Sequence, residues 1–482
     1  WLLDRTWLSL SRPNIGPHVN QTTNPSPSVD GEKPNVAGGN ALLVGPLLPQ
    51  LVRFALPNIG AMLATALAAM AETRYVGSFG TPALAGMALI FPFVMLQNML
   101  SAGAMGGGMS SAISRAIGAN DQERANSLAV HSVWIGLFLG TVYMSIMELC
   151  GPWFLAALGG HGEALAHAVA YSEVAFLGSI FTWTLNTLAS VLRGCGSMKA
   201  PSATLFAVAI AQVVFGGALG LGLGPLPQWG MRGVAAGGVL ANALGAWYLW
   251  SYMARGESRL VLKMKGATLR TDDFTQILRV GAVACASPFQ TVFTILILTK
   301  LVGTFGTHAL AGYGIGTRLE FLLVPIAFAV GVASVPLVGM ALGAGMVARA
   351  RRAAWLAAGL AATILGVVGL VVLIAPDLWT QLFTQDESVM QAARGYFQWA
   401  GPTYALFGLG LSLYFSSLAA GTAVGPVLAG TLRLIVVAIG GAMLASWHAP
   451  AWMVFALVSA GMAAYGIATA FIVLRTSWNK VQ

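Results

Sequence analysis

Residues 76–86 read VGSFGTPALAG and residues 302–312 read VGTFGTHALAG, so nine of eleven positions are identical. Further matches follow at a spacing of 225 rather than 226 residues. They are Gly118-Ala119 with Gly343-Ala344, Arg124-Ala125 with Arg349-Ala350, Tyr171 with Tyr396, Gly196 with Gly421, and Pro201 with Pro426. The chain is therefore a unit of about 225 residues used twice, which is much longer than the repeats of a solenoid protein.

The composition indicates a membrane protein. Of the 482 residues, 57% are hydrophobic and only 9% are charged, whereas a soluble domain has roughly 25% charged residues. Apolar stretches recur along the chain, and each is long enough to cross a hydrocarbon layer of about 30 Å as a helix. A duplicated helical membrane protein of this kind is typical of transporters, in which a binding site lies between two related bundles.

Twelve membrane spans are predicted. They cover approximately residues 51–76, 84–112, 127–149, 167–192, 200–222, 232–254, 275–301, 309–339, 353–375, 394–419, 426–446 and 450–474. Six spans per repeat is an even number, so both halves enter the membrane from the same side and the repeat is parallel. The expected fold is an all-α membrane protein with twelve transmembrane helices in two parallel six-helix lobes.

The domain organisation follows from these spans. An N-terminal segment rich in Asn, Pro, Ser and Gly lacks the features of a secretory signal and is expected to be disordered and cytoplasmic. The predicted parts are this segment at 1–49, an N-terminal lobe at 50–254, a cytoplasmic linker at 255–273, a C-terminal lobe at 274–475, and a tail at 476–482.

Basic residues gather in the loops on one side of the predicted membrane. Thirteen follow spans two, four, six and eight: Arg115, Arg124, Arg193, Lys199, Arg255, Arg259, Lys263, Lys265, Arg270, Arg279, Arg349, Arg351 and Arg352. The other side holds Arg74, Arg232, Lys300 and Arg394. Because basic loops stay in the cytoplasm, both termini are expected there. The net charge of +9 then reflects topology and attraction to anionic lipid, and no nucleic-acid partner is expected.

Charged residues inside predicted spans are the first candidates for function, because a charge at membrane depth is costly without a partner or a cavity. Glu320 lies near the middle of span eight, two residues after Arg318. This spacing puts the two side chains on different faces of one helix, so each needs a partner elsewhere. The alternative is a structural charge pair that locks two helices together.

Glu72, in the last third of span one, is the second candidate. Its repeat-equivalent residue is Leu298, so the two lobes differ at this point. We expect Glu72 to bind a proton or a cation, although it could also reach outward to solvent. Glu148 and Glu173 lie nearer the surface and are interpreted as solvated helix ends.

The sequence shows no motif of an enzyme. No cluster of His, Cys, Asp and Glu has the spacing of a metal site, so no metal and no cofactor are expected. His131 in span three is interpreted as a core residue whose hydrogen bonds are satisfied. The three cysteines, Cys150, Cys195 and Cys285, form no Cys-x-x-Cys pair and are interpreted as reduced.

These motifs resemble those of the MATE (multidrug and toxic compound extrusion) transporters. The duplicated VGxFGTxALAG stretch, the Gly-Ala after the second span of each half, and Arg193-Gly194-Cys195-Gly196-Ser197 followed by Pro201 carry the resemblance. It implies a bacterial inner-membrane antiporter that exports organic, often cationic and aromatic, compounds in exchange for H⁺ or Na⁺. It also implies that Glu72 takes the place of the family's span-one Asp.

Two departures from the family pattern bear on the coupling ion. Gln212 and Gly216 stand where the family has Asn and Asp, and Gln290-Thr291 stands where one branch has Glu. A Na⁺ site of several carboxylates is therefore doubtful, whereas a proton needs one titratable group. Because burial raises the pKa of a carboxylate, protonation near neutral pH is feasible. We expect H⁺ coupling through Glu72, Glu320 or both.

The resulting hypothesis places a drug-sized substrate between the lobes, near Glu320 and Arg318, with the chain acting as a monomer among membrane lipids. The expected aromatic walls are Phe91, Phe93, Phe289 and Phe293, with Gln212 and Gln290 as further polar candidates. Two alternatives remain open. One is a flippase of lipid-linked precursors from the same superfamily, which would need a basic cavity, and the other is a passive channel or a membrane protein of another class.

Overall fold

The structure is a computed structural model that describes residues 41–478, apart from 226, 261, 263–268 and 448. All regular secondary structure in this described part is helical. The α-helices are α1 (Ala41–Val44), α2 (Leu47–Val76), α3 (Thr81–Asn98), α4 (Gly106–Gly118), α5 (Gln122–Ala157), α6 (Gly162–Leu177), α7 (Ser179–Gly194), α8 (Lys199–Leu221), α9 (Gly230–Ala254), α10 (Thr271–Ala284), α11 (Ala286–Gly303), α12 (Thr307–Gly343), α13 (Val347–Ile374), α14 (Asp377–Thr380), α15 (Glu387–Ala419), α16 (Val424–Ser446) and α17 (Ala451–Arg475). A 3₁₀ turn, η1 (Gly77–Phe79), follows α2, and a π-helical segment, η2 (Met99–Met105), joins α3 to α4.

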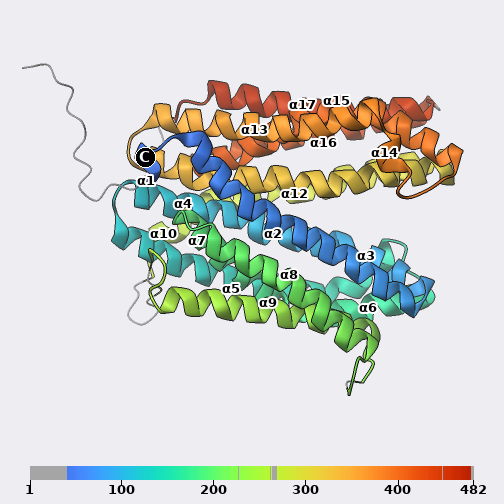
Figure 1. Cartoon of the computed structure of the whole chain (residues 1–482), viewed down its shortest axis with the longest axis horizontal. Coiled ribbons are helices and arrows are strands. Elements are labelled where there is room, and N and C mark those ends of the chain that lie inside the picture. Colours follow the sequence, from blue (N-terminus) through green and yellow to red (C-terminus); the bar gives the residue numbers. More distant parts are fainter. Residues whose placement is uncertain (1–40, 226, 261, 263–268, 448, 479–482) are drawn as a thin grey trace, which may run out of the picture. The chain divides into compact units, whose positions relative to one another are not determined.

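The twelve predicted spans all correspond to long helical segments in the same order, nine to a single helix and three to a pair of helices (Figure 1). In the described part of the chain, nine helical segments are long and apolar enough to cross a membrane, and the bent pair α6–α7 raises the number to ten. The remaining two spans are α9 and α15, with 25 and 33 residues. The predicted class, an all-α membrane protein with two six-helix lobes, is confirmed. We call α2 to α9 the N-lobe and α10 to α17 the C-lobe.

Three predicted spans are interrupted. The fourth bends by 49° at Gly178, between α6 and α7. A Cβ at Gly178 would stand 2.3 Å from a methyl carbon of Val239, so only glycine allows α9 to approach the bend this closely. The seventh span divides at Cys285, and the second passes through η2. Such interruptions leave no trace in hydropathy, because both pieces of each span are apolar.

Several helices also extend beyond the predicted spans. Within the predicted segment 1–49, α1 and the start of α2 are helical, while residues 1–40 lie outside the described part of the chain. Within the predicted linker, α10 begins at Thr271. Arg115 and Arg193, predicted as loop residues, lie inside α4 and α7 because these helices run up to a glycine.

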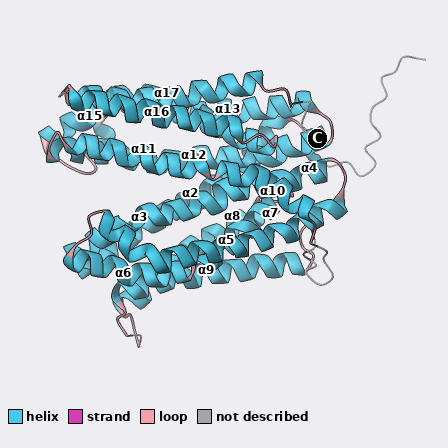
Figure 2. Ribbon diagram, turned by 180° about the vertical axis from the view of Figure 1, so that it is seen from behind, coloured by secondary structure: helices cyan, strands magenta, loops and turns pink. Residues whose placement is uncertain are grey.

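The two lobes lie against each other at the end of the bundle where α4 and α12 finish, and they diverge toward the other end (Figure 2). We call the first end the closed end. Several hydrogen bonds at this end use backbone carbonyls of the opposite lobe. Asn58 Nδ2 donates to the oxygen of Ala329 over 3.2 Å, Ser111 Oγ to that of Leu418 over 2.5 Å, and Arg115 Nη1 to that of Ala419 over 3.0 Å.

Helix α10 adds a second contact between the lobes, because it packs against α4 and α5 of the N-lobe. Ser127 Oγ donates to Asp273 Oδ2 over 2.6 Å. His131 lies 2.8 Å from the oxygen of Ser127 through Nδ1, and its Nε2 accepts from the backbone N–H of Arg270, also over 2.8 Å. Both ring nitrogens thus have partners, so His131 is the satisfied core residue that was predicted.

Glycines allow α4 and α12 to cross with their backbones nearly touching. A Cβ at Gly118 would stand 2.1 Å from the oxygen of Met340, and a Cβ at Gly343 would stand 2.0 Å from the oxygen of Arg115. Gly118 and Gly343 are equivalent positions of the sequence repeat. The same repeated position therefore makes a close backbone contact in both directions, Gly118 with α12 and Gly343 with α4.

This crossing generates a testable prediction. We expect Gly343→Ala to destabilise the closed end, because its methyl group would overlap a backbone oxygen and overpacking costs roughly 1–3 kcal/mol. The measurements are the melting temperature of the purified protein and the distance between spin labels on the starts of α5 and α13. The first should fall and the second should increase.

Gly359→Ala is the matched control, since no atom lies within 4 Å of a Cβ at that position of α13. Alanine favours a helix over glycine by about 1 kcal/mol, so this control should melt at the same or a higher temperature. A Gly343→Ala variant with unchanged melting and unchanged label distance would contradict the role of the crossing.

Candidate functional site

Glu72 and Gln212, two of the predicted candidates, lie together in the N-lobe. Glu72 projects from α2 and is 6% exposed. Gln212 of α8 donates a hydrogen bond from Nε2 to Glu72 Oε1 over 2.7 Å. Glu72 therefore has a neutral amide as its partner, which stabilises the carboxylate without neutralising its charge.

Tyr75 lies one turn from Glu72 on α2 and was not predicted. A Cβ at Gly216 would stand 2.7 Å from the Tyr75 hydroxyl oxygen, so the phenol occupies the space that a side chain at this position would need. Gly216 is the position where the resemblance led us to expect an Asp. The Tyr75 hydroxyl thus fills the space beside residue 216 in which the side chain of the family's Asp would lie.

Glu320 lies inside the C-lobe, where its carboxylate is surrounded by phenols. Tyr396 and Tyr404 of α15 are 0% and 1% exposed. Tyr396 donates a hydrogen bond from its hydroxyl to Glu320 Oε1, and the Tyr404 hydroxyl lies 3.4 Å from the same oxygen. A Cβ at Gly316 would stand 2.2 Å from the Tyr396 ring, so this glycine of α12 is what lets the ring reach Glu320.

A cation completes this cluster. Arg433 of α16 interacts electrostatically with Glu320, and its guanidinium carbon stands 5.4 Å from the centre of the Phe407 ring. Arg318, the cation predicted beside Glu320, is instead exposed and stands 5.1 Å from the centre of the Phe383 ring. Glu320 and Arg318 therefore have different partners, and the basic residue near Glu320 comes from span eleven.

The predicted aromatic walls take different positions. Phe91 of α3 meets Phe321 of α12 edge to face, with ring centres 5.4 Å apart, and so joins the two lobes. Phe93 packs on Phe154 within the N-lobe, at 5.8 Å. Phe289 and Phe293 of α11 are 45% and 55% exposed.

Gln290, the last predicted candidate, lies within the C-lobe. Its Nε2 donates to Thr431 Oγ1 over 2.8 Å, which ties α11 to α16. The structure thus pairs Gln212 with Glu72, but it brings neither Gln290 nor Arg318 into hydrogen-bond contact with Glu320.

The tyrosines near the two carboxylates were missed, although the repeat carries a signal for one of them. Tyr171 and Tyr396 occupy equivalent positions in the two halves. Buried Tyr171 interacts electrostatically with Glu72, and Tyr396 bonds Glu320. Each lobe therefore places the same tyrosine near its own intramembrane carboxylate, although the carboxylates come from different spans of the repeat.

Comparison with known proteins supports the resemblance. The sequence profile of the family described as MatE matches residues 57–216 and 284–444. A probable multidrug resistance protein NorM of Thermotoga maritima is 26% identical over 349 residues, which is 72% of this chain and 74% of that protein. An FAD transporter of Shewanella oneidensis is 23% identical over 322 residues, 65% of this chain and 69% of that one.

The fold has counterparts among solved structures. A multidrug resistance MATE family transporter of the MOP superfamily, in an outward-facing conformation, superposes with a TM-score of 0.82 at 22% identity. The alignment covers 90% of this chain and 97% of that one. The chain belongs to the MatE family and is a multi-pass membrane transporter rather than an enzyme.

The Glu320 cluster makes a prediction about stability. Tyr396→Phe should lower the melting temperature clearly, because it removes a hydrogen bond to a buried charged group, worth about 1.5–3 kcal/mol. Tyr404→Phe is the matched control, since 3.4 Å is beyond the usual range for a hydroxyl bond. Thermal unfolding of both purified variants tests this, and an equal or larger loss for Tyr404→Phe would be inconsistent with the geometry.

Proposed function

We propose that this transporter exports organic compounds in exchange for protons. The observation that carries the proposal is the arrangement of Glu72 and Glu320, two carboxylates inside spans that accept hydrogen bonds from neutral donors, with Arg433 as a further, charged neighbour of Glu320. Gln212 bonds the first and Tyr396 the second. A single carboxylate can take up one proton, whereas an alkali cation would need several oxygen ligands around it. H⁺ is therefore favoured over Na⁺ as the coupling ion.

The substrate class follows from charge and from the relatives. Carboxylates attract cations, and the Phe91–Phe321 contact between the lobes offers aromatic faces on which a flat cation could stack. Two relatives are described as multidrug resistance and multidrug export proteins. We therefore propose cationic, aromatic compounds as substrates. The flippase alternative loses support, because Arg318, its candidate phosphate ligand, is exposed beside Phe383.

The transport cycle would use the closed end as one of two gates. In the conformation seen here the lobes meet at the closed end, which the basic loops would place in the cytoplasm of a bacterial inner membrane, together with both termini. Protonation from the outside would release substrate from the carboxylates, and the lobes would then separate at the closed end. The chain would act as a monomer in lipid, without a cofactor.

Gradient experiments test the coupling ion. Purified protein in liposomes should accumulate a fluorescent cationic dye when a pH gradient is imposed, because the proton gradient supplies the driving force. A Na⁺ gradient at equal pH on both sides should give no accumulation. Dye movement under the Na⁺ gradient alone would overturn proton coupling, and equilibration without accumulation under either gradient would indicate a passive channel.

Conservative variants test the two carboxylates. Glu72→Gln and Glu320→Gln keep the shape of the side chain but cannot exchange a proton. Made separately, at least one of them should reduce pH-driven dye accumulation to the level of protein-free liposomes. Glu173→Gln is the control, because Glu173 forms an exposed pair with Arg232 over 2.9 Å, and such pairs contribute little. If both Glu72→Gln and Glu320→Gln transport like the wild type, the coupling scheme is wrong.

A further inference from the structure

Two pairs of side chains at the closed end repeat one contact in opposite directions. Arg124, at the start of α5 in the N-lobe, donates from Nη2 to Gln276 Oε1 of α10 in the C-lobe over 3.0 Å. Arg349, at the start of α13 in the C-lobe, directs its Nη2 to Gln50 Oε1 of α2 in the N-lobe over 3.4 Å. Each lobe therefore contributes one arginine and one glutamine to the boundary between the lobes.

The four residues occupy equivalent positions of the sequence repeat. Gln50 and Gln276 are 226 residues apart, the spacing of the duplicated VGxFGTxALAG stretch. Arg124 and Arg349 are 225 residues apart, the spacing of the later matches. Two halves related by a two-fold axis form an isologous contact, in which residue i of the first half meets residue j of the second and residue j of the first meets residue i of the second. The two Arg–Gln pairs form such a contact within one chain.

The two pairs differ in strength. Arg349 Nη2 also donates to the backbone oxygen of Leu42 in α1 over 2.8 Å and to that of Gly45, between α1 and α2, over 2.6 Å. The C-lobe thus holds the segment that leads into the N-lobe through three acceptors. Arg349 is half-buried, whereas Arg124 is exposed. Because solvent weakens exposed contacts, the Arg349 pair is the stronger of the two.

The acceptors of both arginines are neutral, namely side-chain amides and backbone oxygens. Among the described residues neither Arg124 nor Arg349 forms an ion pair. Separating a buried ion pair would leave an uncompensated charge behind, at a large cost. A guanidinium and an amide can instead part and each bind water, so these contacts suit an interface that opens and closes.

Both pairs join the first span of one lobe to the third span of the other, so both break when the lobes part at the closed end. We propose that Arg124 with Gln276, and Arg349 with Gln50, are two reciprocal latches that set the population of the closed conformation. Interactions made in only one conformation shift the equilibrium toward it. The inference rests on the proposed cycle only in that the lobes separate, and it is independent of the substrate and of the coupling ion.

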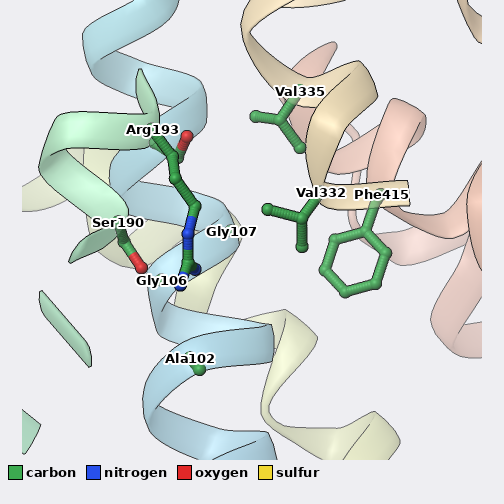
Figure 3. Close-up of a pocket in the computed structure, with 9 residues that line it drawn as sticks. Ala102, Gly106, Gly107, Ser190, Arg193, Val332, Val335 and Phe415 are labelled. Carbon is green, nitrogen blue, oxygen red and sulfur yellow. The ribbon is translucent and has the colours of Figure 1, made fainter. Parts of the chain in front are cut away.

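A buried position between the lobes can report this equilibrium. At the closed end Arg193 of the N-lobe faces Val332 and Val335 of the C-lobe across a cavity of about 10 Å³ (Figure 3). Ser110 of α4 also lines this cavity and is 3% exposed. The space is far too small for a maleimide reagent, so a cysteine in place of Ser110 should react only when the lobes separate.

The test is the rate at which a maleimide labels Ser110→Cys in purified protein whose three native cysteines are alanine, well below the melting temperature of every variant. Arg349→Gln should raise this rate by about tenfold, the effect of losing one bond to a charged group. Arg124→Gln should raise it less, because its pair is exposed. Gln276→Ala should match Arg124→Gln, and the double variant of both arginines should exceed each single one.

Arg351→Gln is the matched control. Arg351 also donates to a backbone oxygen, that of Thr476 over 3.0 Å, but this bond lies within the C-lobe, so the labelling rate should stay that of the parent protein. A double variant that labels at the parent rate would overturn the latches, and so would an equal rise in Arg351→Gln, which would trace to charge alone.

If Arg349→Gln does not fold, Arg124→Gln and Gln276→Ala decide the question. Equal rises in their labelling rates would support the latch, and any other result would overturn it. Since labelling needs neither dye nor gradient, its outcome is separate from that of the transport experiments.

Discussion

The structure depends on one steric constraint, the close crossing of α4 and α12 at the closed end. Both helices reach the crossing with glycine, and the backbone of each fills the space that a Cβ of the other would need. Residues with a Cβ could not bring the two backbones this close, so glycine at both positions is what lets α4 meet α12. Ser111 and Arg115 of α4 donate in addition to the backbone oxygens of Leu418 and Ala419 at the end of α15. Helix α4 therefore contacts the C-lobe both by backbone packing against α12 and by hydrogen bonds to α15.

Away from this crossing, each lobe keeps its own intramembrane carboxylate. Glu72 belongs to α2 and α8, and Glu320 belongs to α12 and α15, so neither needs the other lobe for its hydrogen bonds. Such an arrangement is compatible with lobes that move as rigid bodies, because the partners of each carboxylate move with it. Arg193 is different, since the cavity that it faces has walls from both lobes. Its surroundings change whenever the lobes move apart.

The fold was largely predictable because membrane insertion imposes a simple rule. A span must be apolar and about twenty residues long. The match between residues 76–86 and 302–312 shows that the two halves contain their spans in the same order. The candidate site was predictable only in part. Glu72 and Glu320 stand out because charges at membrane depth are rare, but a buried tyrosine looks like any other aromatic core residue. Tyr75 and Tyr404 therefore gave no signal, whereas Tyr396 gave a weak one through its match with Tyr171.

The sequence by itself determined the twelve spans, the two parallel lobes and the identity of the costly charges, because each of these follows from local composition and from the repeat. Only the tertiary structure decided the partners of those charges. Arg318 and Glu320 are neighbours in sequence, yet one contacts Phe383 and the other Tyr396. The surroundings of Arg193 are likewise decided by the tertiary structure, because residues of α4, α12 and α15 pack around its side chain. Helix packing sets these contacts, and packing between helices is not encoded in the hydropathy of any one of them.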